Sequence, residues 1–456
     1  LLLAAGKAAA YDYGDIVPQY CHSAGDWGPL PKRPDGAIAL RQVQVFIRHG
    51  ARTQCRADYC WSGDQQAGNF TCSLRYLENS VDNRESPLTP YFRTVYLDGR
   101  NTLPGNCLMG QLVEAGFDME YANGRRLREA YVTGEDFLPP SLAPLSEAAI
   151  ERDFTFRSSD VPRTKQSGMA LVSGLYGGSP ANTPFITLKT MDIAKENMLV
   201  NPRVCGATAA AGTKFFDGLP AVQSRELIGL CSQLHPAVAT SAGSCFWWLQ
   251  HLVDCLMSRA CPTVPFSPHN ATIPEQFLED DAALLRRIWR IVDTVQFEYF
   301  KKMADVGAFG PLASEILEAS DAAVGAEAGQ KKKFVLYSGH DMGPMEPLYA
   351  VFGLRANPPY WPAFASMLVL EIWDTDEGPI VRWISNGEVV AGPVPYAEFR
   401  TKAEALAASA SRCGAPASAQ PPTAPPKEVA WVSGEGMAMS ALSTSLTLAL
   451  MFGLWA

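Results

Sequence analysis

The chain has 456 residues, 47 acidic against 38 Lys and Arg residues, a formal net charge of -9 and a pI near 5.3. This acidic balance argues against a nucleic acid partner, because no basic stripe is available to neutralise phosphodiesters. The length exceeds one average domain, but an α/β core with an inserted cap reaches this size as one functional unit.

The N-terminal segment and the cysteines indicate a secretory route. Residues 1–10 are mostly leucine and alanine, which predicts the remnant of a signal peptide, although Lys7 is atypical of one. Eleven cysteines without metal-binding spacing predict disulfides, and the odd count leaves at least one thiol free or paired with another chain. Asn69 and Asn270 are predicted glycosylation acceptors because each begins an Asn-X-Thr sequon.

The most informative segment is an apolar run, Val43–Ile47, followed by Arg48-His49-Gly50-Ala51-Arg52. The run predicts a buried strand that delivers a histidine between two arginines. By itself, a tripeptide such as Arg48-His49-Gly50 is more often a polar loop after a strand. If the segment is instead part of a catalytic site, the arginines would bind phosphoryl oxygens and a neutral histidine would offer a nitrogen lone pair to phosphorus.

Two further strand ends supply the rest of such a site. A predicted strand over 153–156 leads into Arg157, ahead of a helix through residues 169–175, and a second strand over 334–337 leads into His340 and Asp341. Arg157 alone could be an exposed arginine, and Asp341 could cap a helix opened by Pro344. The carboxyl ends of parallel strands lie at one edge of a sheet, so we expect the three ends to converge.

The remaining elements complete the predicted order. Residues 55–106 are predicted to form an irregular loop over the site, and residues 110–133 a helix. The cysteine-rich stretch 192–274 is predicted to be a helical cap inserted in the core. Residues 284–299 carry one apolar face at helical spacing. Strands are expected at 367–373 and 380–390, with Asn386-Gly387 as a hairpin turn within the second.

The C-terminal part has the composition of a linker and an anchor. Residues 411–435 are rich in Pro, Ala and Ser, and 437–456 are apolar. The apolar stretch predicts a spanning helix or a glycolipid-anchor signal, which would hold the catalytic part at a membrane from its luminal or outer side. A buried C-terminal helix is the alternative.

These motifs resemble the histidine acid phosphatases, the larger branch of the histidine phosphatase superfamily, and among them the lysophosphatidic acid phosphatase type. The resemblance is carried by residues 48–52, 157–164 and 174–176 and by His340-Asp341. It implies a mostly parallel central sheet flanked by helices, with a smaller helical cap, in a domain spanning 11–410. It also implies a reaction without metal or cofactor.

Residue roles follow from the same resemblance. His49 would be the nucleophile that becomes a phosphohistidine, and Asp341 the proton donor to the leaving group. Four side chains would bind the phosphate: Arg48, Arg52, Arg157 and His340. Arg163, Lys165, Arg125 and Arg126 are predicted to lie outside the first contact layer.

The sequence departs from the family pattern in two loops. Gln54 replaces a proline after the first motif, and Met342-Gly343-Pro344 replaces the hydroxyl residues that follow His-Asp in the family. Neither change removes a charged group, so both bear on substrate preference more than on activity.

The function expected from the sequence is an acid phosphatase of small phosphomonoesters in the secretory pathway, tethered to a membrane. One alternative is a narrower phosphatase for inositol phosphates, lysophospholipids or a phosphorylated sugar. A mutase is opposed by the cysteines and by both ends. The alternative of another class is a catalytically inactive surface binding protein.

Overall fold

The computed structural model describes residues 20–21, 27–55, 70, 72, 107–177, 186–261, 275–277, 279–325, 332–355 and 358–414. The predicted signal remnant, the two sequons, most of the 55–106 loop and the linker and anchor of 411–456 after residue 414 lie outside these ranges. Within them, no helix is both long and apolar enough to cross a membrane.

A single seven-stranded sheet runs through the described residues in the order β3-β2-β4-β1-β5-β6-β7. β3, β2, β4 and β1 pair in parallel, whereas β5, β6 and β7 join by antiparallel pairing. Five of the seven strands therefore point in one direction, which confirms the expected mostly parallel α/β sheet. The bounds are β1 Ala39–Arg48, β2 Phe154–Ser159, β3 Leu188–Met191, β4 Phe334–Gly339, β5 Met367–Asp374, β6 Ile380–Ser385 and β7 Glu388–Pro395.

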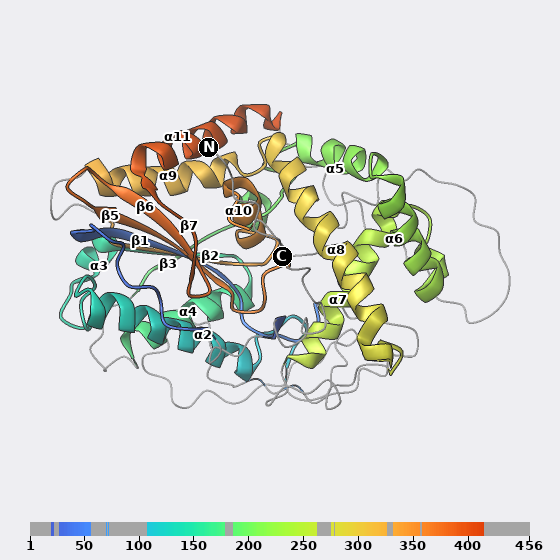
Figure 1. Cartoon of the computed structure of the whole chain (residues 1–456). Coiled ribbons are helices and arrows are strands. Elements are labelled where there is room, and N and C mark those ends of the chain that lie inside the picture. The colour runs from blue at the N-terminus through green and yellow to red at the C-terminus, as the bar shows by residue number, and fades with distance from the viewer. Residues whose placement is uncertain are drawn as a thin grey trace.

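Helices cover both faces of this sheet, because each central strand is apolar on both sides. Phe334 and Leu336 of β4 pack in one cluster with Leu171 of α4, whereas Val335 and Tyr337 pack in another with Ile316 of α9. Figure 1 shows α2 and α4 below the sheet and α9 and α11 above it. These flanking helices are α2 Glu114–Leu127, α3 Glu147–Asp153, α4 Pro162–Tyr176, α9 Gly310–Gly325, α10 Met345–Phe352 and α11 Tyr396–Ala408.

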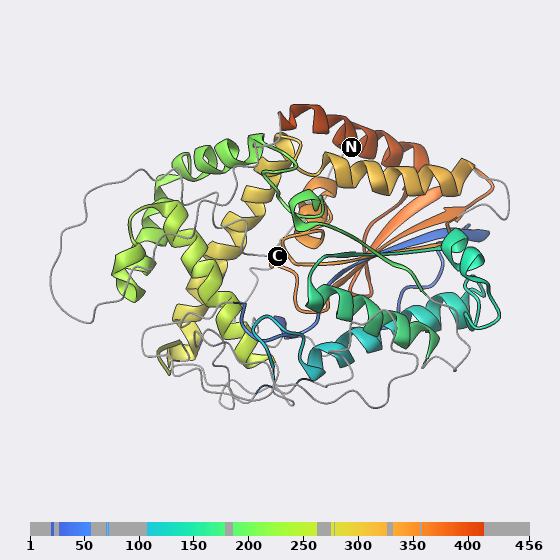
Figure 2. The same ribbon diagram turned by 180° about the vertical axis from the view of Figure 1, so that it is seen from behind.

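A second group of helices lies beside the sheet, as Figures 1 and 2 show from opposite sides. It contains α5 Ala207–Asp217, α6 Ala221–Leu234, α7 Ala242–Ala260 and α8 Glu279–Asp305. α8 confirms the predicted long amphipathic helix, because Ile288, Val292, Val295 and Tyr299 are all buried. The division into a core and an inserted cap over 192–274 stays a prediction.

Two local expectations from turn and cysteine chemistry are confirmed. Asn386 and Gly387 connect β6 to β7, and their φ angles of +50° and +87° suit a hairpin turn of mirror-image type. Cys55 carries a free thiol. The disulfides among described residues are Cys21–Cys261, Cys72–Cys107, Cys205–Cys413 and Cys231–Cys245.

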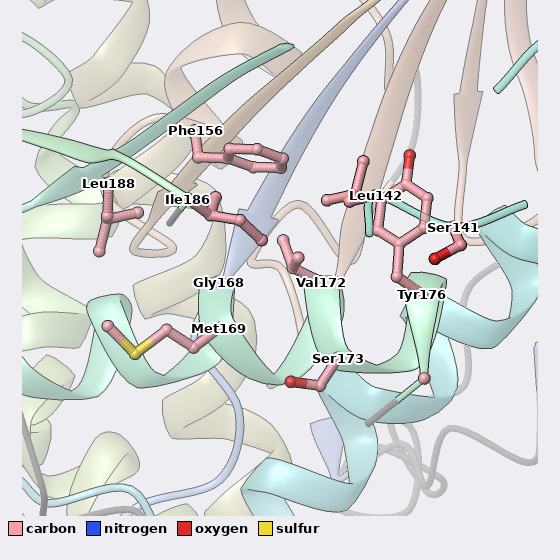
Figure 3. A pocket seen from close by; sticks show the side chains of 11 residues that line it. Ser141, Leu142, Phe156, Gly168, Met169, Val172, Ser173, Tyr176, Ile186 and Leu188 are labelled. Atoms are coloured by element: carbon pink, nitrogen blue, oxygen red, sulfur yellow. The ribbon is translucent and has the colours of Figure 1, made fainter. Parts of the chain in front are cut away.

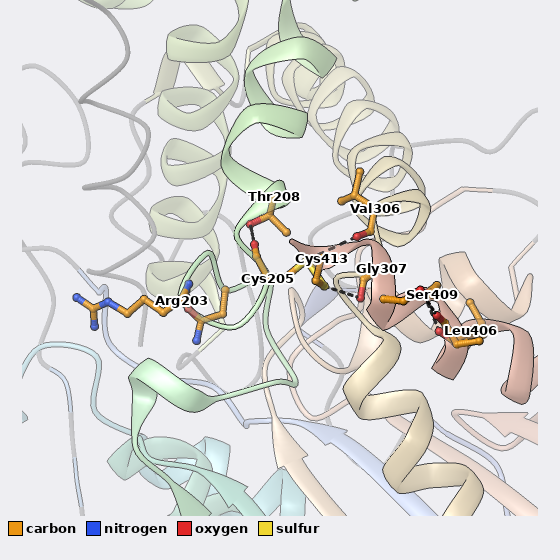
Figure 4. Close-up of a disulfide and its surroundings, with 11 residues drawn as sticks. Arg203, Cys205, Thr208, Val306, Gly307, Leu406, Ser409 and Cys413 are labelled. Atoms are coloured by element: carbon orange, nitrogen blue, oxygen red, sulfur yellow. Dashed lines mark hydrogen bonds between the residues drawn. A yellow bond between two sulfur atoms is a disulfide. The ribbon is translucent and has the colours of Figure 1, made fainter. Parts of the chain in front are cut away.

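One of these disulfides links the C-terminal end of the described residues to the group of helices α5 to α8. Cys205, which precedes α5, is bonded to Cys413 beyond α11 (Figure 4). The two sulfurs lie against the carbonyl oxygens of Val306 and Gly307, at 3.6 and 3.2 Å. The bond therefore links α5, the end of α8 and the segment after α11.

Candidate active site

The carboxyl ends of β2, β4 and β1 are neighbours in the sheet, so the residues that follow them converge as expected. The amide of His49 donates to the carbonyl of Gly339 at 2.9 Å, which joins the first motif to the last. The rings of His49 and His340 meet edge to face with centroids 5.5 Å apart. Segments separated by about 290 residues thus form one site.

His49 is held with one nitrogen free to react. Its Nδ1 lies 2.9 Å from the carbonyl oxygen of Gly50, which can only accept, so Nδ1 carries the hydrogen and Nε2 the lone pair. Burial lowers the pKa of His49 well below its usual value, and the charges of Arg163, Arg52 and Arg48 lower it further. The ring therefore stays neutral into the acidic range.

Gly50 fixes where this ring lies. A Cβ at Gly50 would be 2.1 Å from the carbonyl oxygen of Gly116 in α2, so only glycine lets the two backbones approach. α2 thereby packs directly against the loop that carries His49.

Arg48 is fully buried at the end of β1. Its guanidinium lies against the rings of Tyr20 and Phe364, 4.7 and 4.2 Å from their centroids. Nη1 donates to the carbonyl of Pro362 at 2.7 Å, and Nη2 is 3.1 Å from Oδ2 of Asp341. The guanidinium of Arg48 is therefore held in place by aromatic rings as well as by polar partners.

Arg52 is oriented by α7. Its Nη2 donates to both carboxylate oxygens of Asp254, at 2.8 and 3.0 Å, and its Nη1 donates to Oγ of Ser258 at 3.1 Å. Burial lowers the pKa of Arg52, but the charge of Asp254 and the hydrogen bonds that it accepts act in the opposite direction, and the net shift of that pKa is upward. Arg52 is therefore a permanent cation held by a helical carboxylate.

His340 contacts the segment between β2 and α4. Its Nε2 is 2.9 Å from Oγ of Ser159, and its Nδ1 is 3.4 Å from Nη2 of Arg163. Because a guanidinium can only donate, Nδ1 accepts and Nε2 carries the hydrogen. Burial lowers the pKa of His340 well below its usual value, and Arg163 and Arg52 add to the effect.

Asp341 does not cap the following helix. α10 begins at Met345 without a side-chain cap, whereas Oδ1 of Asp341 accepts from the amide of Met342 at 2.9 Å. Oδ2 accepts from Nε1 of Trp361 at 2.5 Å and faces Arg48. The carboxylate is therefore aimed at the arginines rather than at a helix end.

The structure does not bring Arg157 to this site. Its Nη2 donates to Glu196 and Asn197 at 2.9 and 2.7 Å, and its Nη1 is 3.5 Å from Glu315. The guanidinium also lies over the ring of Tyr337, which packs on the α9 face of the sheet. An arginine within β2 follows the strand's alternation, and this position points away from His49.

Arg163 stands where Arg157 was expected. It lies in the first turn of α4, directly after the strand end, and its guanidinium reaches His340. The sequence held the necessary signal, because Pro162 opens the helix at that point and the first turn of a helix after a strand faces the site. Asp254 and Trp361, by contrast, lie in segments with no local motif.

Three buried guanidiniums, those of Arg48, Arg52 and Arg163, thus surround His49, and we call them the arginine cluster. The Nε atom of each is buried without a hydrogen-bond partner. Within the described residues no group of three or more His, Cys, Asp or Glu side chains could hold a metal ion. The unmet N–H donors make the cluster suited to a tetrahedral oxyanion.

A separate apolar cavity lies between α4 and the strands β2 and β3 (Figure 3). None of the residues discussed above faces it. Its lining includes Phe156, Gly168, Met169, Val172, Tyr176 and Leu188.

Known proteins share both the sequence pattern and the fold. Residues 39–225 match the sequence model of the histidine phosphatase superfamily, branch 2. Counting factor 60 of Dictyostelium discoideum is 27% identical over 386 residues, which cover 81% of this chain and 85% of that protein. A probable acid phosphatase of Schizosaccharomyces pombe is 25% identical over 361 residues, 74% of this chain and 73% of that protein.

Among solved structures, the phytase from D. castellii superposes with a TM-score of 0.50 at 14% identity, covering 90% of each chain. At that identity the likeness shows the fold. This likeness in fold agrees with the match of residues 39–225 to branch 2 of the histidine phosphatase superfamily.

Proposed function

We propose that the chain is an acid phosphatase that hydrolyses small phosphate monoesters through a phosphohistidine on His49. One observation carries the proposal: the lone pair of His49 Nε2 lies within a cluster of three buried guanidiniums that have unused N–H donors. A neutral nucleophile inside a cationic clamp suits phosphoryl transfer, in which positioning and charge stabilisation dominate.

In the first step the arginine cluster binds the phosphoryl oxygens. Nε2 of His49 attacks phosphorus, and the P–O bond to the alcohol breaks. A proton on Asp341 passes to the departing oxygen, so the alcohol leaves neutral.

In the second step a water molecule attacks the phosphohistidine. Asp341, now a carboxylate, accepts the proton of that water while the N–P bond breaks. Phosphate is released, and His49 regains its lone pair. The depressed pKa of His49 supports operation in acid, because the nucleophile remains unprotonated there.

The disulfides among the described residues indicate an oxidising compartment, and we propose that the enzyme acts in the secretory pathway. Its tethering by residues 437–456 stays a prediction.

The testing experiment is phosphate release from p-nitrophenyl phosphate at about pH 5 with a metal chelator present. His49→Ala should lower kcat by at least about a thousandfold, because the covalent route is lost. His235→Ala is the matched control, since His235 packs on Trp248 in the helical group and should turn over normally. Chelator-resistant turnover that survives in His49→Ala would refute the mechanism.

The role of Asp341 needs a second pair of substrates. Asp341→Asn should slow an alkyl phosphate far more than an aryl phosphate, because only the alkoxide needs protonation to leave. Equal slowing of both would reject Asp341 as the acid. If wild-type enzyme binds phosphate without turning over any ester, the inactive binding protein becomes the better assignment.

A further inference from the structure

Asp254 is a buried carboxylate inside a site that must bind an anion. It comes from α7, it is 1% exposed, and both of its oxygens accept from Nη2 of Arg52. Its Oδ1 is also 3.8 Å from Nη2 of Arg48. A negative charge here competes directly with phosphate, so its presence requires an explanation.

The position of Asp254 is rigidly determined. Its backbone carbonyl accepts from Oγ of Ser258 at 2.9 Å, and that hydroxyl in turn accepts from Arg52. Cys261, at the end of α7, is bonded to Cys21 beside Tyr20, whose ring covers Arg48. α7 therefore cannot withdraw the carboxylate without breaking contacts on several sides.

Charged and titratable groups surround Asp254 from every side of the site. Its electrostatic neighbours come from several elements. They are Arg48 of β1, Arg52 of the loop after it, Arg163 of α4, His251 of α7 and Tyr20 of the N-terminal segment. Asp341 lies across Arg48.

The charges of this site can be counted. The arginine cluster supplies three positive charges, and Asp254 and Asp341 supply two negative ones, while His49 and His340 are neutral. The net charge is one positive. Each of these residues is at most 7% exposed, so solvent does little to screen an imbalance.

A phosphate monoester carries two negative charges above about pH 6. Such a dianion in a site of net charge +1 leaves one uncompensated negative charge in a nearly dry interior, which is costly. Uptake of one proton from solvent restores neutrality, and Asp341 is the carboxylate placed to hold it next to the leaving oxygen.

We infer that Asp254 couples the binding of a phosphate monoester to the uptake of one proton. The inference rests on the proposed function for the location of the phosphate. Asp254 acts as a positioning residue: it holds Arg52 and neutralises one positive charge, so that a bound dianion recruits the proton that Asp341 then delivers. The proton comes from solvent and leaves with the product alcohol. The proton that Asp341 later accepts from the attacking water returns to solvent when phosphate dissociates, so no further reactant is needed.

The Asp254→Asn variant separates these two roles. Its amide oxygen still accepts from Arg52, but the site gains one positive charge and can bind the dianion without a proton. For an alkyl ester, the alkaline limb of kcat/KM should move down by about 1 to 3 pH units, because a neutral residue at position 254 no longer favours a proton on Asp341. A purely structural role would lower activity at all pH values and leave the limb in place.

The direct test is calorimetric titration with inorganic phosphate at about pH 7.5, in buffers of different ionisation enthalpy. Wild type should take up about one proton per phosphate bound, and Asp254→Asn about none. Glu196→Gln is the matched control, because it removes the charge of a buried carboxylate that pairs with Arg157 at 2.9 Å, outside the cluster. It should keep both the proton uptake and the pH limb.

The outcomes are distinguishable. Binding without proton uptake in wild type, with turnover intact, overturns the inference and leaves the proposed function standing; this holds even if Asp254→Asn does not fold. Loss of uptake in His251→Gln assigns the proton to His251 and also overturns it. Absence of both phosphate binding and turnover in wild type overturns the proposed function and the inference together.

Discussion

Two of the buried charged networks differ in how completely their donors are used: one around Glu371 and the arginine cluster. At Glu371 of β5, Oε1 accepts from the hydroxyl of Tyr131 and Oε2 from Nε1 of Trp373, both at 2.7 Å, and from Arg382. The remaining nitrogens of Arg382 donate to the carbonyls of Lys32 and Pro31. We call this set the Glu371 network, and no donor or acceptor in it is left over.

The arginine cluster has the opposite character. It holds three guanidiniums against two carboxylates, and each guanidinium keeps a buried Nε without a partner. Unmet donors cost free energy unless something supplies acceptors. A balanced network stabilises the fold, whereas an unbalanced one is prepared for an anion, and the following experiments test that distinction.

The largest expected effect on stability is in the Glu371 network. Arg382→Met leaves Glu371 buried without its cation and should lower the free energy of unfolding by about 3 to 5 kcal/mol. Urea unfolding measures this change. The kcat/KM of the folded variant should match wild type, and a large loss of kcat/KM would show that the two networks are not independent.

The next effect separates Arg157, within β2, from Arg163, in the first turn of α4. Arg163→Ala should lower kcat/KM by about 100- to 1000-fold, the usual effect of removing one donor to transition-state charge. Arg157→Ala should leave kcat/KM within about threefold, because its partners are structural. If Arg157→Ala lowered kcat/KM more than Arg163→Ala, Arg157 rather than Arg163 would be assigned to the phosphate site.

A ligand should relieve the imbalance of the cluster. Inorganic phosphate at a hundred times its Kd should raise the free energy of unfolding by about 2.7 kcal/mol in wild type. In Arg163→Ala the same phosphate concentration should give much less stabilisation. Equal stabilisation of both proteins would place the phosphate elsewhere.

The smallest effect is the pH dependence of stability. Burial holds the pKa values of His49 and His340 well below 6.5 in the folded chain. The unfolded chain therefore binds more protons as pH falls through 6.5, and stability is lost in that direction, by up to about 1.4 kcal/mol per pH unit for each histidine. His340→Asn should reduce this slope between about pH 4.5 and 6.5 in urea titrations. An unchanged slope would mean that His340 is not buried neutral.

The local parts of the site could be predicted because short segments contain them. An apolar strand that ends in Arg48-His49, and another that ends in His340-Asp341, bring their residues to one edge whatever the rest of the chain does. Arg157 was expected beside His49, but the structure places it among Glu196, Asn197 and Tyr337, because no local motif shows which face of β2 a residue occupies.

Asp254 could not be found from the sequence at all. It lies in the middle of a helix, about 200 residues from Arg52, and only the packing of α7 against the first motif brings the two together. Long-range pairing of single charges leaves no pattern in a lone sequence. The same reasoning applies to Trp361, which contacts Asp341 from an irregular segment.

The position of β1 in the sheet has a consequence for biosynthesis. Among the described strands β1 is the first to be made, yet its two neighbours are β4 and β5, which begin at residues 334 and 367. At about 5 to 20 residues per second, a ribosome needs tens of seconds to supply them. During that interval Val43, Val45 and Ile47 have no partner strand in the native arrangement. The nascent chain should therefore depend on chaperones until its second half has emerged, and a chain truncated before residue 334 should aggregate rather than fold.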